Sequence, residues 1–92
     1  MAAEKSIITV VGKDQFGIIA RVTMFLYEKN VNVEDISQTI VGGFFNMMMI
    51  VDTSTSTLSF LDLSVQLEEL GKKIGVIIKL QREDIFKSMQ RI

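Results

Sequence analysis

The chain has 92 residues, of which 48% are hydrophobic, and its 10 Lys and Arg nearly balance its 11 Asp and Glu. It contains no Cys and no His, which excludes disulfides, thiolate metal sites and the most usual general base. The chain has no basic stretch of the kind that is typical of nucleic-acid binding. No apolar run approaches the roughly 20 residues that span a bilayer. We therefore expect one cytoplasmic domain, residues 1–92, that binds neither nucleic acid nor membrane and uses no cofactor.

The first part of the chain predicts a strand followed by a helix. Residues 5–12 are apolar on both faces, which is typical of a strand in the centre of a sheet. Residues 17–29 carry apolar side chains at helical spacing, and Asn30 is a suitable residue for the end of a helix. The two elements are joined by a turn with a glycine at each end.

A β-hairpin is predicted next. Residues 31–41 read as a strand whose apolar alternation is imperfect, and a bulge near Glu34 and Asp35 would restore it. The pair Gly42-Gly43 is a strong hairpin signal. Residues 44–52 then form the second strand of the hairpin, apolar on both faces.

The last part predicts a connector, a helix, a strand and a final helix. The polar connector covers 53–57 and the helix 58–73, with Leu61, Val65, Leu67 and Leu70 among its apolar positions. A strand follows at 75–82, and a short helix at 84–91 ends the chain, with Asp84 as its cap.

The order of these elements is β-α-β-β-α-β plus a short C-terminal helix. Right-handed crossovers convert that order into an α+β fold, the ferredoxin-like sandwich. We expect a four-stranded antiparallel sheet with two helices on one face.

The turn that follows the first strand is the strongest candidate for a binding site. Its sequence is Gly12-Lys13-Asp14-Gln15-Phe16-Gly17, and a helix begins directly afterwards at Ile18. A helix start presents free backbone N–H groups and the positive end of the helix dipole, which suit a carboxylate or phosphate. Asp14 suits an ammonium group. We predict that a small zwitterion places its carboxylate on the N–H groups near Phe16, Gly17 and Ile18.

Each of these residues also has a purely structural interpretation. Gly12 and Gly17 could serve only to form a tight turn, and Asp14 could cap the helix, alone or while contacting a ligand. The spacing resembles a P-loop, but Ile18-Ile19 stand where the Lys and the hydroxyl residue of that loop would be, so nucleotide hydrolysis is rejected.

Two other clusters are interpreted as structural. Glu34 and Asp35 are neighbours in a strand and point to opposite faces, so they would chelate a metal poorly, and no metal site is predicted. The run Met47-Met48-Met49 could form an adaptable binding surface, but ordinary core packing is the preferred interpretation.

The segment Val11-Gly12-Lys13-Asp14-Gln15-Phe16-Gly17-Ile18-Ile19-Ala20 resembles the opening of an ACT domain, a small regulatory module that commonly binds amino acids. The resemblance extends over nearly the whole chain, which is similar to the small stand-alone UPF0237 proteins of bacteria and archaea. It includes the segments Asn30-Val31-Asn32-Val33, Asp35-Ile36-Ser37-Gln38-Thr39, the three-methionine strand, and Ile85-Phe86-Lys87-Ser88-Met89.

The resemblance implies a homodimer in which residues 31–41 and the first helix pack against their copies. It also implies a ligand between the turn and the start of that strand. Four residues match the turn of the family, namely Gly12, Asp14, Phe16 and Gly17, and Asn32 of the paired subunit matches the polar residue that faces it. Many ACT domains have Pro or Ser in place of Phe16, so this large ring is expected to narrow the site or close over it.

The sequence therefore predicts a non-catalytic regulatory module that binds a small ligand, an amino acid, at a homodimer interface; it names no protein target. The alternative is a ligand-free interaction module whose apolar surfaces dock a target. A small enzyme is a third hypothesis, in which Asp14 would act through a bound water. The lack of His and Cys argues against it, because few groups remain that titrate near neutral pH.

Overall fold

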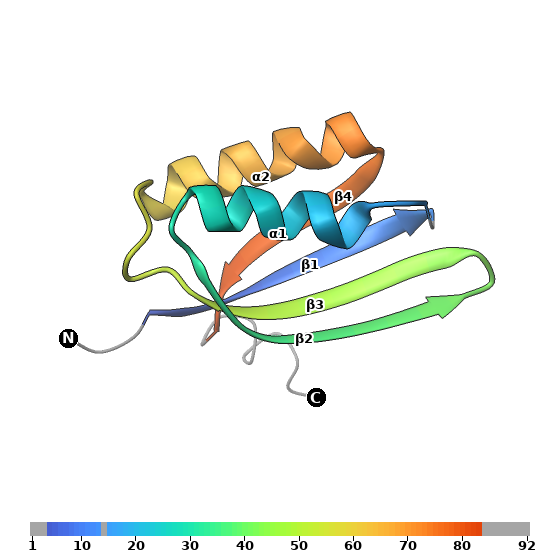
Figure 1. Ribbon diagram of the computed structural model, residues 1–92, viewed down its shortest axis with the longest axis horizontal. Coiled ribbons are helices and arrows are strands. Elements are labelled where there is room, and N and C mark those ends of the chain that lie inside the picture. Colours follow the sequence, from blue (N-terminus) through green and yellow to red (C-terminus); the bar gives the residue numbers. More distant parts are fainter. Residues whose placement is uncertain (1–3, 14, 84–92) are drawn as a thin grey trace.

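The computed structural model describes residues 4–13 and 15–83 and contains six elements (Figure 1). They are β1 (Lys5–Lys13), α1 (Ile18–Glu28), β2 (Asn32–Val41), β3 (Phe44–Asp52), α2 (Phe60–Ile74) and β4 (Val76–Arg82). The predicted order of strands and helices is confirmed. The final helix expected at 84–91, with its cap Asp84, lies outside the described residues.

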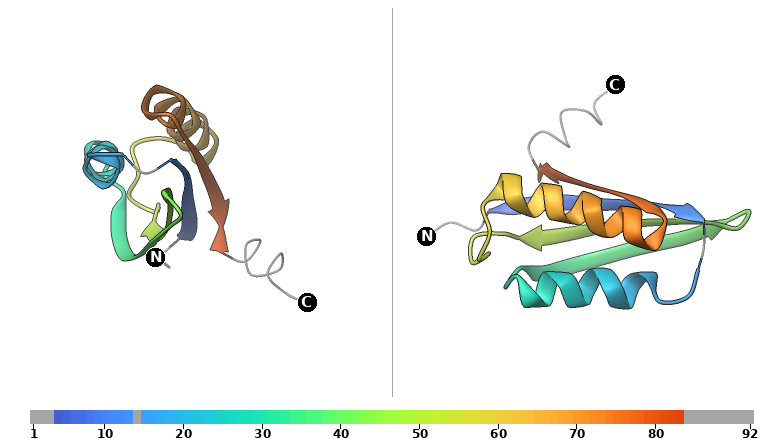
Figure 2. Two further views of the ribbon diagram at one scale, coloured as in Figure 1. Left: turned by 90° about the vertical axis from the view of Figure 1, so that its right-hand side faces the viewer. Right: turned by 90° about the horizontal axis from the view of Figure 1, so that it is seen from above.

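The four strands form one antiparallel sheet in the order β2-β3-β1-β4. The strands that are apolar on both faces, β1 and β3, occupy its centre, as the sequence indicates. Both helices cover the same face of the sheet, with α1 near β2 and α2 near β4 (Figure 2). The predicted ferredoxin-like α+β sandwich is therefore confirmed.

The expected bulge in β2 is present. Val33 pairs with Val51 and Asp35 with Ile50, so Glu34 is an extra residue on the edge strand. The extra residue brings the apolar side chains before and after the bulge to the helix-facing side of the sheet. The imperfect alternation in the sequence thus has a local structural cause.

The boundaries of α1 follow from residues with left-handed backbone. Gly17, at φ 85°, is the N-cap rather than the first helical residue, and the helix ends at Glu28. Asn30 has φ 62°, which confirms its role at the end of the helix. In the same turn, the N–H of Val31 donates to the carbonyl of Leu26 at 2.9 Å.

The second helix begins two residues later than the sequence predicts, at Phe60 instead of residue 58. The hydroxyl of Ser59 accepts a hydrogen bond from the N–H of Asp62 at 3.1 Å, which makes Ser59 the N-cap. Before it, Leu58 is held in a turn because its N–H donates to the hydroxyl of Ser56 at 3.0 Å. The polar connector is therefore longer than predicted.

The buried stripe of α2 also differs from the expected one. It consists of Leu63, Leu67, Gly71 and Ile74, which recur at helical spacing and face the sheet. Leu61 and Val65 lie outside this stripe, and their side chains are 70% and 45% exposed.

The core lies between the sheet and the helices. Met47 and Met49 are part of it, which confirms core packing for these two, whereas Met48 lies on the opposite face and is 39% exposed. The largest fully buried apolar side chains are those of Ile8, Ile18, Leu26, Met49, Leu63, Leu67, Ile78, Val10, Val22 and Val51.

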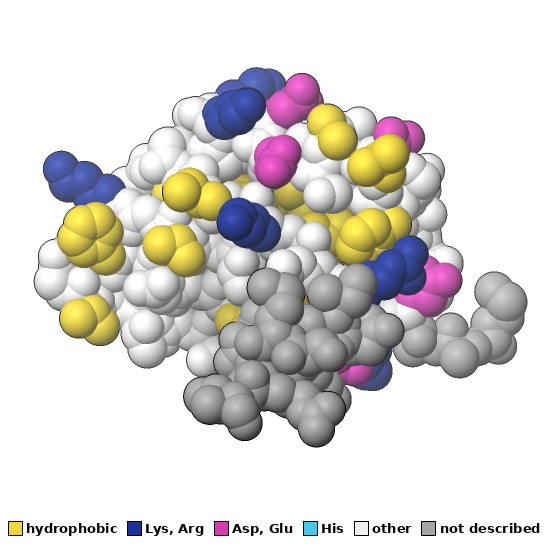
Figure 3. All heavy atoms as spheres, turned by 180° about the vertical axis from the view of Figure 1, so that it is seen from behind, with side chains coloured by type: hydrophobic (Ala, Val, Ile, Leu, Met, Phe, Trp, Pro, Cys, Tyr) yellow, Lys and Arg dark blue, Asp and Glu magenta, His cyan; other side chains and the backbone are white. Residues whose placement is uncertain are grey.

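The face of the sheet opposite the helices carries several exposed apolar side chains. The register of the strands assigns Val11, Val41, Phe44, Met48 and Ile77 to this open face, and all are exposed. On the face seen from behind, the visible hydrophobic side chains lie in several groups among polar atoms and a few charged side chains (Figure 3).

Candidate functional site

The turn between β1 and α1 is held by a glycine whose backbone conformation would strain most other residue types. Gly17 has φ 85°, a left-handed conformation that costs an L-residue about 1–2 kcal/mol. A Cβ atom at this position would have no heavy atom within 4 Å, so the space beside Gly17 is open. Backbone conformation, and not crowding, therefore requires glycine here.

The start of α1 is left without a side-chain cap among the described residues. The first helical hydrogen bond runs from the N–H of Arg21 to the carbonyl of Gly17 at 3.0 Å. The amide groups ahead of Arg21 have no partner in the helix, and no acidic residue lies in the first turn. These N–H groups and the dipole behind them favour an anionic group.

Phe16 lies directly before this helix start and is fully exposed, at 104% of its reference area. In a single chain this ring packs against no other part of the protein, and its role in narrowing the site or closing over it stays a prediction. Asp14, the predicted partner of an ammonium group, lies outside the described residues.

Gly12, at the other end of the turn, has a reason to be glycine that involves no ligand. It pairs with Val76 across the β1–β4 ladder. A Cβ atom on Gly12 would lie 2.7 Å from Cγ1 of Val76, closer than non-bonded carbon atoms approach. The close packing of β1 and β4 accounts for this glycine, and its contact with a ligand stays a prediction.

Asn32 is not near the turn within one chain. It is the first residue of β2 and pairs with Asp52, whereas Lys13, the last residue of β1, pairs with Phe44 at the other end of β3. Eight residues of extended chain separate these two ends, about 27 Å. The turn and Asn32 can share a ligand only if they come from different subunits.

Asn32 lies instead in a pocket of about 170 Å³ at the C-terminal end of α1. Two reciprocal hydrogen bonds hold one wall: the side-chain amide of Asn30 donates to the carbonyl of Thr55, and the hydroxyl of Thr55 donates to the carbonyl of Asn30, both at 3.0 Å. The pocket is lined by Tyr27, Asn30, Val31, Asn32 and Thr55. Sequence reasoning missed it because the bonds join residues 25 positions apart.

The same end of the sheet carries further polar contacts. The side chain of Asp52 accepts from the N–H of Ser54 at 2.9 Å and from that of Glu4 at 3.2 Å. These bonds, that of Ser54 first, lower the pKa of Asp52 below its ordinary value. A hydrogen bond to Glu34 raises the pKa of Lys5. This end is thus stabilised by its own polar groups.

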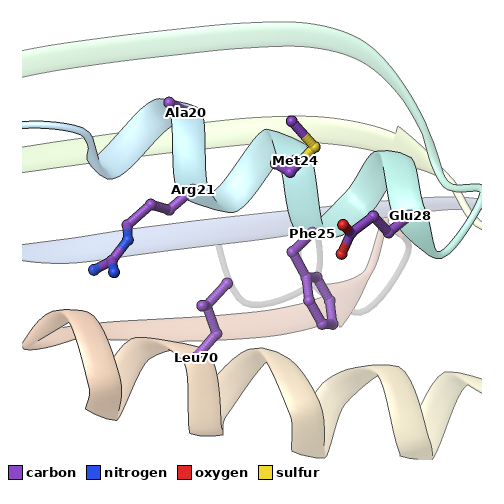
Figure 4. A pocket seen from close by; sticks show the side chains of 6 residues that line it. All are labelled: Ala20, Arg21, Met24, Phe25, Glu28 and Leu70. Carbon is purple, nitrogen blue, oxygen red and sulfur yellow. The ribbon is translucent and has the colours of Figure 1, made fainter.

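A groove of about 440 Å³ lies between the two helices (Figure 4). Arg21 and Phe25 extend from α1 toward α2, and Leu70 extends from α2 toward them (Figure 4). The groove is mainly apolar and lies on the outside of the helix layer, away from the predicted ligand residues.

Two negative findings apply to the described part of the chain. Its acidic side chains form no group that could hold a metal ion. Within residues 4–13 and 15–83, neither helix has the length and hydropathy that spanning a bilayer requires.

The architecture and the glycine-bounded turn define a small domain of the ACT class, and residues 4–81 match the family model described as the ACT domain. A UPF0237 protein of Bifidobacterium longum is 58% identical over 88 residues, which are 96% of this chain and 98% of that protein. The chain therefore belongs to the ACT domain family, within its UPF0237 group, and the members of that family are generally regulatory, ligand-binding modules.

Solved structures agree with this assignment. An ACT domain protein from Streptococcus pneumoniae is 40% identical, with a TM-score of 0.81 over 94% of this chain and 97% of that one. A putative glycine cleavage system transcriptional repressor is 24% identical, with a TM-score of 0.77 over 89% of this chain and 47% of that one. The second likeness concerns the fold alone.

Proposed function

We propose that this chain is a non-catalytic regulatory module that binds a small amino acid or similar zwitterion at the interface of a homodimer. Its ligand lies at the turn of residues 12–18. The carboxylate accepts hydrogen bonds from N–H groups near Phe16, Gly17 and Ile18, and the ammonium group pairs with Asp14.

The start of α1 is the observation that carries this proposal. Its amide groups have no cap from a described side chain, and the space beside Gly17 is open to an incoming group. Backbone N–H groups at a helix start bind anions without any basic side chain. A ligand with a carboxylate fits this arrangement, and the negative charge of Asp14 suits a ligand that also carries an ammonium group.

A homodimer is proposed because the edge formed by β2 and α1 leaves apolar side chains in solvent. Ile36 and Ile40 face the helix side of the sheet but are 40% and 56% exposed, and Tyr27 of α1 is 79% exposed. The free edge of β2 also presents unpaired backbone groups, which pair readily with another strand. A second copy would cover both features at once.

This dimer would supply the missing part of the site. When two β2 strands pair antiparallel about their middles, the Asn32 end of one strand lies beside the Val41 end of the other. In each chain, Val41 pairs with Phe44, and Phe44 pairs with Lys13 at the end of β1. Asn32 of one subunit would then face the turn of the other and complete its polar contacts.

Calorimetry of the full chain against each common amino acid tests the ligand. We expect at least one to bind, and Asp14→Ala to weaken that binding by about 1.5–3 kcal/mol through the loss of a charged hydrogen bond. The matched control is Glu68→Gln, which neutralises an exposed carboxylate on α2 and should leave affinity unchanged.

Stability of the same variant separates the two roles of Asp14. The loss of a helix cap would lower the free energy of unfolding by about 1 kcal/mol. If stability falls while affinity for every amino acid that binds stays flat, Asp14 is a cap and the proposed site is wrong.

The second candidate function is a ligand-free interaction module. It is favoured by the exposed apolar side chains of the open sheet face, such as Val11, Phe44 and Ile77. Absence of binding to every amino acid tested would favour this candidate over the first.

A further inference from the structure

Two features of α1 are unsatisfied in a single chain, and they lie at its opposite ends. Phe16, just before the helix, is fully exposed. The pocket lined by Tyr27, Asn30, Val31, Asn32 and Thr55, here called the Tyr27 pocket, lies just after the helix. The two features are complementary, because an exposed aromatic ring can fill an open pocket.

The pocket has room for an aromatic ring. Its volume is about 170 Å³, and a cavity of about 150 Å³ in another protein holds a benzene molecule. The exposed ring of Tyr27 supplies the apolar surface of the pocket, and Val31, which is buried, contributes little to it. The hydrogen bonds between Asn30 and Thr55 fix the opposite wall, so the pocket is formed before anything enters it.

The ring of Phe16 cannot enter the pocket of its own chain. The ring and the pocket lie at opposite ends of α1, whose 11 residues have a length of about 16 Å. A two-fold axis perpendicular to α1 exchanges the ends of the helix, and the antiparallel pairing of two β2 strands has such an axis. The same operation that would bring Asn32 to the turn of a second copy would therefore bring Phe16 to the end of α1 where that copy has its Tyr27 pocket.

We propose that Phe16 of each subunit docks in the Tyr27 pocket of a second copy of this chain. This inference rests on the proposed homodimer and adds the contact that fixes its register. Two equivalent contacts form per dimer, one at each end of the paired helices. Each ring then lies over the ligand site formed by its own turn and the partner's Asn32, so assembly closes the site that an isolated chain leaves open.

Disulfide trapping tests the contact directly, because the natural chain contains no cysteine. A Phe16→Cys variant is mixed with a Thr55→Cys variant under mild oxidation. We expect a covalent heterodimer, since a disulfide requires Cα atoms within about 7 Å. The control mixture replaces Phe16→Cys by Phe44→Cys, an exposed residue at the same end of the sheet but on its open face, and should give none.

Sedimentation of truncated variants tests whether the contact stabilises the dimer. Phe16→Ala should raise the Kd of the dimer by about 30-fold or more, as for an interface hot spot. Phe44→Ala removes a ring of the same size and should change it less than threefold, within the range of neutral surface changes. An equal effect of the two variants would overturn the docking of Phe16.

The outcomes distinguish this inference from the proposed function. A wild-type dimer in which the Phe16→Cys and Thr55→Cys variants do not cross-link contradicts the Phe16 contact and leaves the dimer and its ligand intact. A wild-type chain that sediments as a monomer at micromolar concentration contradicts both.

Discussion

The two helices are completed in different ways, although they cover the same face of one sheet. α2 begins with the side-chain cap of Ser59, has an acid in its first turn and lysines in its last, and ends at the left-handed Gly75. α1 begins at Gly17 with no such cap from the described residues. The terminal backbone groups of α2 are thus capped from within the helix and its flanking residues. The amide groups at the start of α1 remain available for a ligand, as we propose.

The largest effect expected from this comparison concerns the packing of α2. Gly71→Ala should lower the free energy of unfolding by about 1–3 kcal/mol, the range for overpacking a tight contact. A Cβ atom at Gly71 would lie 2.6 Å from the carbonyl oxygen of Val76, a backbone atom that cannot rotate away. Denaturant unfolding measures the change.

The sign of this change is informative, because helix propensity acts the other way. In an uncrowded helix, Gly→Ala stabilises by about 1 kcal/mol. The control Gln66→Ala, at a half-buried position of α2, should stay within about 0.5 kcal/mol of the wild type. A stabilised Gly71→Ala variant would show that α2 does not pack against β4 as closely as described.

A smaller loss is expected at the start of α1. Gly17→Ala should lower the free energy of unfolding by about 1–2 kcal/mol, because its left-handed φ strains a side chain even where space is open. Gly17→Asn should cost less, since Asn tolerates this conformation. Equal losses for the two variants would point to crowding and against backbone strain.

The cap of α2 gives the next effect. Ser59→Ala should lower the free energy of unfolding by about 1 kcal/mol, because the N–H of Asp62 loses its acceptor. Ser59→Thr keeps the hydroxyl and should retain most of the stability. Thermal unfolding of both variants measures the difference, and a Ser59→Ala variant as stable as the wild type would refute the cap.

The smallest effect is a pH dependence at the turn after β3, which Asp52 holds with its side chain. The pKa of Asp52 is lowered in the folded state, so its contribution is fully present above the unfolded-state pKa and is lost as the pH falls through the folded value. The stability difference between wild type and Asp52→Asn should therefore shrink below about pH 4. A difference that is constant with pH would contradict the role of the carboxylate.

Much of the fold is encoded locally and could be predicted. The glycine pair of the hairpin, the two-sided apolar strands β1 and β3 and the disturbed period of β2 each correspond to one structural feature. The first residue of α2 could not be predicted. Leu58 fits the apolar pattern of the helix, but its N–H donates to the hydroxyl of Ser56 in a turn, and the cap by Ser59 makes the helix begin after residue 59.

The candidate site divides in the same way. A glycine-bounded turn at a helix start can be recognised in sequence. That Gly12 is required by the neighbouring strand β4, and Gly17 by its own backbone conformation, becomes visible only in the folded chain. The Tyr27 pocket could not be predicted, since the hydrogen bonds between Asn30 and Thr55 form only after the connector folds back on the end of α1.

The contact between Gly12 and Val76 sets a rule for how sequences of this fold can vary. A Cβ atom on Gly12 would lie nearest to Cγ1 of Val76, at 2.7 Å, so a smaller residue at 76 would relieve the worst of the crowding, while Cα of residue 76 would still lie at 3.1 Å. Gly71 meets the main chain of the same residue and has no such exchange. Among related sequences, we expect a larger residue at position 12 to occur together with a smaller one at position 76, while position 71 stays glycine. This pattern does not depend on ligand binding.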